Sequence, residues 1–134
     1  MARMFFKKSQ QRLEAARHEF HAARTALEEQ FLETAGASGR PRGLRWIECR
    51  FYGEPAFARE ASSGRLQALI GVSIRFEAIE GGGMEEVEAV GNVRAATAVF
   101  RYEQDHWTTD GRAVFNLDPQ QTITHFRLTP LDAS

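Results

Sequence analysis

The sequence predicts an α+β fold in which one long N-terminal helix packs across a four-stranded antiparallel meander sheet, followed by a short C-terminal helix. Three features indicate this fold: an amphipathic stretch at 9–35, strict apolar alternation at 66–78, and turn signals that join neighbouring strands. A chain of 134 residues has the length of one domain and can bury a core without disulfides or metal. We therefore expect residues 1–134 to form a single α+β domain.

The composition is that of an ordinary globular protein. Hydrophobic residues make up 43% of the chain and charged residues 26%, and the formal net charge is −1. This balance gives no overall attraction to nucleic acid or to an anionic membrane surface. A single cysteine excludes an internal disulfide, and no apolar run is long enough to span a membrane. We expect a cytoplasmic protein that binds neither nucleic acid nor membrane.

Residues 9–35 are expected to form the long helix. They contain no Pro or Gly, and apolar side chains recur at alternating intervals of three and four, which places them on one stripe: Leu13, Ala16, Phe20, Ala23, Leu27 and Phe31. Ser9 is the expected N-cap and Gly36 the expected C-cap. We expect residues 1–8 to be a flexible arm and residues 36–43 a linker between helix and sheet. The stripe is expected to pack on the sheet, although its spacing also suits a short coiled-coil seam.

Four strands are expected, at 44–60, 66–78, 94–103 and 106–117. In the second of these, every even-numbered residue is apolar, so one face of the sheet points toward a core. The first strand alternates in the same way, with Ile47, Cys49 and Phe51 expected to point inward. The Gly53-Glu54-Pro55 segment interrupts it and indicates a bulge or bend on an edge strand.

Turn positions predict the strand register. A two-residue turn at Ser63-Gly64 would place Phe57 opposite Ile70, Phe51 opposite Phe76 and Arg50 opposite Glu77. A second tight turn at Gln104-Asp105 would pair Tyr102 with Trp107 and Ala96 with Ala113. The inward residues of the last strand would then be Trp107, Thr109, Ala113, Phe115 and Leu117. All hairpins agree on which face is inside.

The tail begins with a helix-start signature, Asp118-Pro119-Gln120-Gln121, which supplies an N-cap, Pro at the first helical position and Gln at the third. We expect a short helix from 119 to about 127. The β-branched segment 122–124 favours a strand instead.

Two clusters of side chains resemble metal sites and are interpreted otherwise. His18 and His21, with Glu14, share one helix face, but the sequence provides no further ligand for them. The glutamates around Gly81-Gly82-Gly83 lack the spacing of a calcium loop. We expect no metal and no cofactor.

A long helix over a curved antiparallel sheet is similar to the architecture of the cystatin-like superfamily, which includes the nuclear-transport-factor-like cone folds. The resemblance covers residues 9–117 and implies a cavity between helix and sheet, where enzymes of the cone folds place Asp, His or Tyr. Here the inner face offers four candidates for such a cavity: Cys49, Tyr102, Trp107 and Thr109. It has no carboxylate or histidine that could act as a general base, and Cys49 is expected to be an inert core thiol. A small-molecule-binding domain or minor enzyme with this cavity is therefore the alternative hypothesis.

The opposite, outer face of the sheet is the preferred binding surface. Its candidate residues are apolar, aromatic or basic: Trp46, Arg50, Tyr52, Leu69, Arg75, Val99, Arg101, Arg112 and Val114. An apolar strip bordered by arginines and aromatics is typical of protein interfaces. Equally, the chain's own tail, through Ile123, Phe126 and Leu128, can cover this face. Our hypothesis is a non-enzymatic interaction module that forms a homodimer or binds another protein through its outer face.

Overall fold

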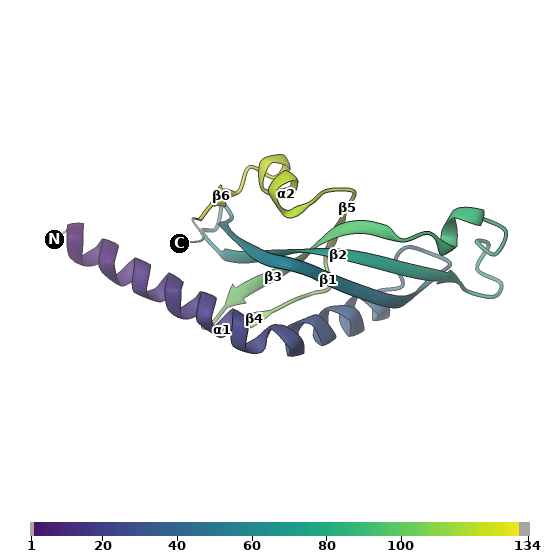
Figure 1. Ribbon diagram of the computed structural model, residues 1–134, viewed down its shortest axis with the longest axis horizontal. Helices are drawn as coiled ribbons and strands as arrows, with labels where there is room; N and C mark the ends of the chain where they lie inside the picture. The colour runs from purple at the N-terminus through teal and green to yellow at the C-terminus, as the bar shows by residue number, and fades with distance from the viewer. Residues whose placement is uncertain (1, 132–134) are drawn as a thin grey trace.

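The computed structural model describes residues 2–131, with side chains for residues 9–87 and 90–131. A long helix, α1 (Ala2–Ala37), runs along one face of an antiparallel sheet, and a short helix, α2 (Pro119–His125), lies on the opposite face (Figure 1). The α+β class with a long N-terminal and a short C-terminal helix is thereby confirmed. We call the face under α1 the inner face and the face under α2 the outer face.

The sheet has six strands rather than the four expected. They are β1 (Leu44–Arg59), β2 (Leu66–Ala78), β3 (Arg94–Glu103), β4 (His106–Thr108), β5 (Ala113–Phe115) and β6 (Thr129–Pro130). The order is β4-β3-β2-β1-β6, and β5 also pairs with β3. A short 3-10 helix, η1 (Glu88–Gly91), lies in the β2–β3 connection. The two additional strands arise because the expected strand 106–117 is divided and because the tail returns to pair with the end of β1.

Gly111 explains why the last expected strand is divided. Its φ is +78°, and a Cβ built there would lie 2.5 Å from the backbone nitrogen of Ala35. Only glycine tolerates both this backbone conformation and this close approach to the helix. The chain therefore turns against the end of α1 between β4 and β5, and the expected pairing of Ala96 with Ala113 is replaced by Ala96 with Phe115.

Helix α1 is longer than the sequence suggested. It begins at Ala2 instead of Ser9, so residues 2–8 continue the helix past the end of the sheet, where an arm was expected (Figure 1). It ends at Ala37, one residue beyond the expected C-cap Gly36, and Gly39 adopts the positive φ that often follows a helix.

The inner core lies between α1 and the sheet. The predicted helix stripe is confirmed: its six residues are buried or partly buried in this core, and Phe20 and Phe31 are fully buried. The ring of Phe20 makes edge contacts with Phe57, Phe100 and Trp107 at centroid distances of 5.8, 5.5 and 5.0 Å. These rings fill the space where a cone fold would have a cavity, so the core is a packed interior.

The register between β1 and β2 differs from the expected one. Phe57 lies opposite Ala68, Phe51 opposite Val72 and Arg50 opposite Ser73. The turn is larger than two residues, because the NH of Glu60 bonds to the carbonyl of Arg65 and closes a longer loop. An irregularity between Tyr52 and Ala56 shifts the register further, at the Gly53-Glu54-Pro55 segment where a bulge was expected. Both shifts are even, so inward residues stay inward.

A second irregularity, between Trp46 and Glu48, changes which side chains at the start of β1 point toward the inner face. Trp46 packs on Phe31 and Phe76 in the inner core, with centroid distances of 6.2 and 5.0 Å. Its indole NH donates to the carbonyl of Arg40. Ile47 is exposed instead. The placement of Trp46 on the outer face was therefore wrong, because an extra residue at a bulge changes which side chains point inward.

Candidate functional site

The four residues expected to line an inner cavity do not form one site. Trp107 is buried, and its indole NH donates to the carbonyl of Ala16 at 2.8 Å. Thr109 is also buried, and its hydroxyl donates to the carbonyl of Val99 at 2.9 Å. These bonds tie β4 and the chain beyond it to α1 and β3, which is a structural use of both polar groups.

Cys49 and Tyr102 lie at opposite ends of the inner face. Cys49 pairs with Ile74 near one end of β2, whereas Tyr102 pairs with Trp107 beyond the other end. Burial, with a smaller contribution from Glu48, raises the pKa of the Cys49 thiol to about 12. Burial and a hydrogen bond to Glu19 raise the pKa of the Tyr102 hydroxyl. Neither group is activated as a nucleophile or base at neutral pH.

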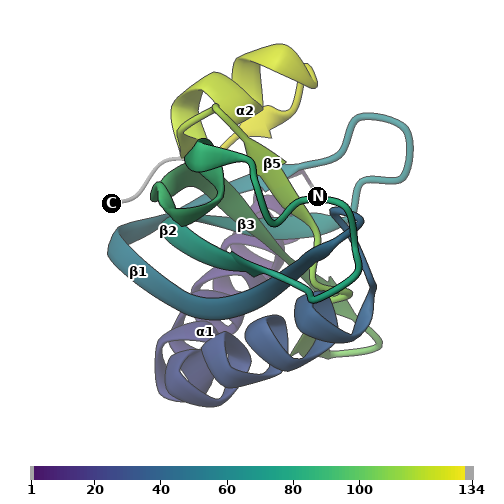
Figure 2. The same ribbon diagram turned by 90° about the vertical axis from the view of Figure 1, so that its right-hand side faces the viewer.

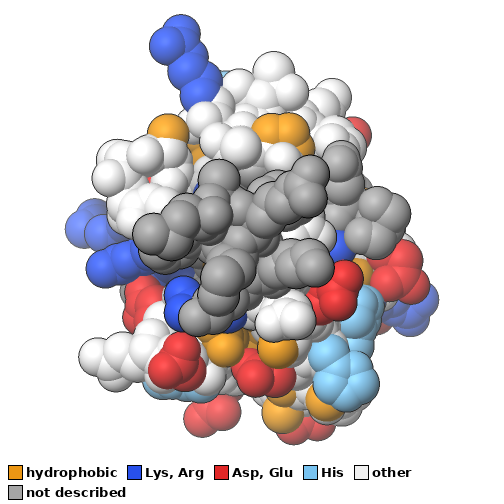
Figure 3. Space-filling view, turned by 90° about the vertical axis from the view of Figure 1, so that its left-hand side faces the viewer, with side chains coloured by type: hydrophobic (Ala, Val, Ile, Leu, Met, Phe, Trp, Pro, Cys, Tyr) orange, Lys and Arg blue, Asp and Glu red, His pale blue; other side chains and the backbone are white. Residues whose placement is uncertain are grey.

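A polar hollow of about 560 Å³ lies near Tyr102, between α1 and the β1–β2 turn. Arg12, Arg59 and Arg65 line this hollow. Figure 3 views this end of the molecule, and among its coloured residues positive and negative side chains are interspersed. The basic lining of the hollow is therefore bordered by acidic side chains on the same end of the molecule.

The outer face is divided into two halves. One half is covered by α2 and the tail, where Leu69, Val99 and Ile123 are buried together with Ala58, and Leu128 packs against them. The tail thus covers part of the outer face, as the alternative interpretation had it. Phe126 does not join this cluster and stays 42% exposed. Leu69, Val99 and Val114 were therefore placed on the correct face, but they are roofed over.

A cavity of about 230 Å³ remains between the sheet and this roof, and we call it the outer pocket. Its apolar wall consists of Leu69, Val99, Val114, Phe126 and Leu128. Its polar residues are Glu60, Gln67, Arg112 and Thr122. A concave, mostly apolar space with a few converging polar groups is the usual form of a small-molecule site.

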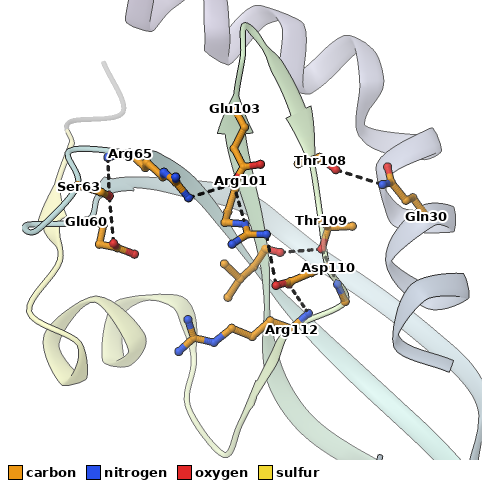
Figure 4. A network of polar contacts seen from close by, with 12 residues as sticks. Gln30, Glu60, Ser63, Arg65, Arg101, Glu103, Thr108, Thr109, Asp110 and Arg112 are labelled. Atoms are coloured by element: carbon orange, nitrogen blue, oxygen red, sulfur yellow. Dashed lines mark hydrogen bonds and ion pairs between the residues drawn. The ribbon is translucent and has the colours of Figure 1, made fainter. Parts of the chain in front are cut away.

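A network of polar and charged side chains includes the two charged residues of the outer pocket, Glu60 and Arg112 (Figure 4). Arg101 lies between Glu103 and Asp110, at 3.5 and 3.4 Å. The Glu60 carboxylate and the Arg112 guanidinium extend toward each other from opposite sides of the network. Hydrogen bonds from Ser63 and Ser62 lower the pKa of the Glu60 carboxyl, so it is ionised at neutral pH. The pocket mouth therefore presents one negative and one positive group.

The other half of the outer face is open, and we call it the open half: Glu48, Arg50, Tyr52, Ser73 and Arg75. Tyr52 is 49% exposed, and its ring lies over Gly71 of β2, where a Cβ would come within 2.5 Å of the ring. Arg50 forms an ion pair with Glu48. The residues of the open half other than Tyr52, together with Val93, line a hollow of about 230 Å³. Arg50, Tyr52 and Arg75 are thus where the sequence placed them.

The edge of the sheet beside the open half is unpaired. Strand β1 pairs with β2 along one side, but β6 pairs with its other side only at Ala58 and Arg59. Within the described residues, no strand pairs with this side of β1 at 48–52. The Arg24 guanidinium donates to the carbonyl of Gly53 and thus occupies one group just beyond that segment. The edge at 48–52 can accept a further strand.

The described part of the chain contains no group of three or more His, Cys, Asp or Glu arranged to hold a metal ion. None of the described helices is long and apolar enough to cross a membrane.

No protein-family model, curated protein or solved structure matches the chain. The similarity to the cystatin-like superfamily therefore stays a prediction, and function has to be inferred from the residues themselves.

Proposed function

We propose that the protein is a non-enzymatic interaction module that self-associates through the β1 edge and the open half of the outer face. The unpaired edge of β1 at residues 48–52 carries this proposal. Backbone NH and carbonyl groups on such an edge gain hydrogen bonds when a second strand is added, and a second copy of the same strand is always present in solution.

The charges on this edge are self-complementary. If two copies of β1 pair antiparallel about a two-fold axis at Cys49, Glu48 lies opposite Arg50 of the partner subunit, and Arg50 lies opposite the partner's Glu48. Both side chains are on the outer face, so the two ion pairs form side by side. A two-fold axis at Arg50 would instead place like charges opposite each other, which favours the first arrangement.

The surroundings limit the strength of this interface. Irregularities at both ends of the segment shorten the edge available for pairing. Stable interfaces bury about 1,200–2,000 Å² in total, so the side chains of Tyr52 and Arg75 in the open half must contribute area as well. We therefore expect a reversible dimer in the micromolar range.

The inner face supports no competing enzymatic function. Its aromatic side chains fill the space under α1, and its polar groups are used in hydrogen bonds within the fold. The thiol of Cys49 and the hydroxyl of Tyr102 both have raised pKa values, which opposes their use as nucleophiles.

Sedimentation velocity over about 1–100 µM protein tests the proposal. We expect the wild type to shift from monomer to dimer across this range. The variant Arg50→Glu presents two glutamates on the edge and Glu48→Arg presents two arginines, so each variant should stay monomeric because like charges oppose each other.

A mixture of the two variants provides the matched control. Glu48→Arg and Arg50→Glu protomers carry complementary charges, and we expect them to form a heterodimer although neither associates alone. A wild type that stays monomeric at the highest concentration, or variants that dimerise as it does, would contradict the proposal.

A further inference from the structure

We propose that the outer pocket binds a small zwitterion with an apolar side chain, which is the chemistry of a free apolar α-amino acid. The apolar wall would take the side chain, Arg112 the carboxylate and Glu60 the ammonium group. This site lies under α2 and is separate from the β1 edge, so it is independent of self-association.

The size and lining of the pocket set the apolar part of the ligand. A cavity of about 150 Å³ lined by aliphatic and aromatic side chains is enough to bind benzene. The outer pocket, at about 230 Å³, can hold a group the size of a leucine or phenylalanine side chain. Leu69 and Val99 form a fully buried floor for it. A nucleotide or a polycyclic cofactor would not fit in this volume.

Gln67 gives independent support for a ligand. Its side chain is only 4% exposed and lines the pocket, on a strand whose other outer-face neighbour here is Leu69. Among the described residues, no hydrogen bond satisfies its amide, whereas the other buried polar residue of the wall, Thr122, donates to the carbonyl of Asp118. The amide atoms keep some accessible surface in the pocket, so a polar group of a ligand can form a hydrogen bond with them.

The charges at the mouth set the polar part of the ligand. Arg112 influences the ionisation of Glu60, yet within the described residues the two groups form no direct ion pair. The Arg112 guanidinium lies 4.8 Å from the centroid of the Phe126 ring, which holds it at the pocket roof. Glu60 is held by Ser62 and Ser63 on the other side. A ligand that carries both charges can bridge this gap, whereas a simple carboxylate would be repelled by Glu60.

Ligand-detected and ¹⁵N-edited NMR titrations with L-leucine and L-phenylalanine test the site. Two analogues of L-leucine serve as matched probes: N-acetyl-L-leucine lacks the positive charge, and 3-methylbutylamine lacks the carboxylate. We expect L-leucine to shift the amide signals of Gln67, Leu69 and Val114. Each analogue should bind at least about tenfold more weakly, because each leaves one charge of the mouth unpaired.

Two charge-removing variants then assign the roles. Arg112→Gln should weaken L-leucine at least about tenfold without weakening 3-methylbutylamine, which has no carboxylate. Glu60→Gln should weaken L-leucine without weakening N-acetyl-L-leucine. Arg75→Gln, in the open half, is the control and should bind L-leucine as the wild type does.

Three results would overturn the inference: no shifts at about 10 mM amino acid, shifts confined to residues outside the outer pocket, or equal affinities for L-leucine and its analogues. Arg112 is exposed and Glu60 is partly exposed, and the folding of both variants is checked directly from the same spectra. Repeating the titration with Arg50→Glu protein separates this result from self-association, since the pocket does not involve the β1 edge.

Discussion

Cys49 illustrates how the position of a side chain on a strand controls its chemistry. It lies on the inner face of β1, half-buried against the inner core, between the exposed side chains of Glu48 and Arg50. Loss of water around the sulfur disfavours the thiolate, and the Glu48 carboxylate adds to this effect, so the pKa rises from 9.0 to about 12. The loss of water and the nearby carboxylate both explain why an unreactive thiol is expected at this position.

We predict that Cys49 reacts slowly with iodoacetamide in the folded protein. At pH 8 the thiolate fraction should be at least about a hundredfold lower than in the unfolded chain, because the pKa is raised. Mass spectrometry of the alkylated protein, with and without denaturant, measures the two rates. Equal rates would contradict the raised pKa.

The same shift predicts a pH dependence of stability. Between pH 9 and 12 the unfolded chain releases the Cys49 proton and the folded protein retains it, so the free energy of unfolding falls as pH rises through this window. Below pH 9 both states hold the proton and no dependence arises from this residue. Cys49→Ala is the control, because it should remove this part of the slope and leave that of Tyr102.

At the scale of single elements, α2 is held in place by its first turn. The Asp118 carboxylate accepts from the backbone NH of Gln121 at 2.7 Å, and the Gln121 side chain accepts from the NH of Asp118 at 2.9 Å. This capping box fixes the start of a helix of only 7 residues, which could not form by itself. The roof of the outer pocket therefore depends on one exposed cap.

We predict that Asp118→Ala lowers the stability of α2 by about 1 kcal/mol, because the orphan NH groups of its first turn lose their acceptor. The readout is amide hydrogen exchange, in which peptides covering 119–126 should exchange faster than in the wild type. Gln120→Ala is the matched control, since Gln120 is exposed and takes no part in the cap. Unchanged exchange in Asp118→Ala would show that tertiary contacts alone hold the helix.

Periodicity was enough to predict the main elements. The helix stripe and the even-numbered face of β2 both lie in the inner core, because alternation and the helical repeat depend only on local geometry. The signature Asp118-Pro119-Gln120-Gln121 likewise identified α2, whose cap is formed by side chains within one turn. At α2 the capping signals outweighed the strand preference of the β-branched segment 122–124, because the cap supplies hydrogen bonds that fix the first helical turn.

The β1–β2 register and the outer pocket could not be predicted from local sequence patterns. The β1–β2 register depends on the size of a loop and on two bulges, none of which changes the alternation that the sequence displays, except at Trp46. Glu60, Gln67, Thr122, Phe126 and Leu128 were missed as pocket residues. The sequence offered two signals for this region: Gln67, a polar residue within a buried strand, and the apolar tail residues Phe126 and Leu128, which were expected to cover the outer face. That the tail stops short of filling the space depends on tertiary packing.

For the whole molecule, the sheet separates two cores of unequal size. The inner core contains the aromatic cluster and the apolar stripe of α1, whereas the outer cluster has only four buried members, Ala58, Leu69, Val99 and Ile123. A smaller cluster under a short helix opens more readily than the main core, because less apolar area is exposed when it separates. The roof of the outer pocket can thus move without unfolding the sheet, so the pocket can widen around a ligand that enters through its mouth.

Truncating one buried side chain in each core should therefore destabilise different parts of the molecule. We predict that Phe20→Ala lowers the global free energy of unfolding by about 3–5 kcal/mol, because Phe20 contacts three other rings at the centre of the inner core. It should accelerate hydrogen exchange in β2 and β3 as well as in α2.

Ile123→Ala removes a buried side chain of the roof, and we expect it to accelerate exchange mainly in peptides covering 117–130 while β2 and β3 remain protected. Acceleration of β2 and β3 by Ile123→Ala to the same extent as by Phe20→Ala would mean that the two cores unfold as one unit and that the roof does not move separately from the sheet.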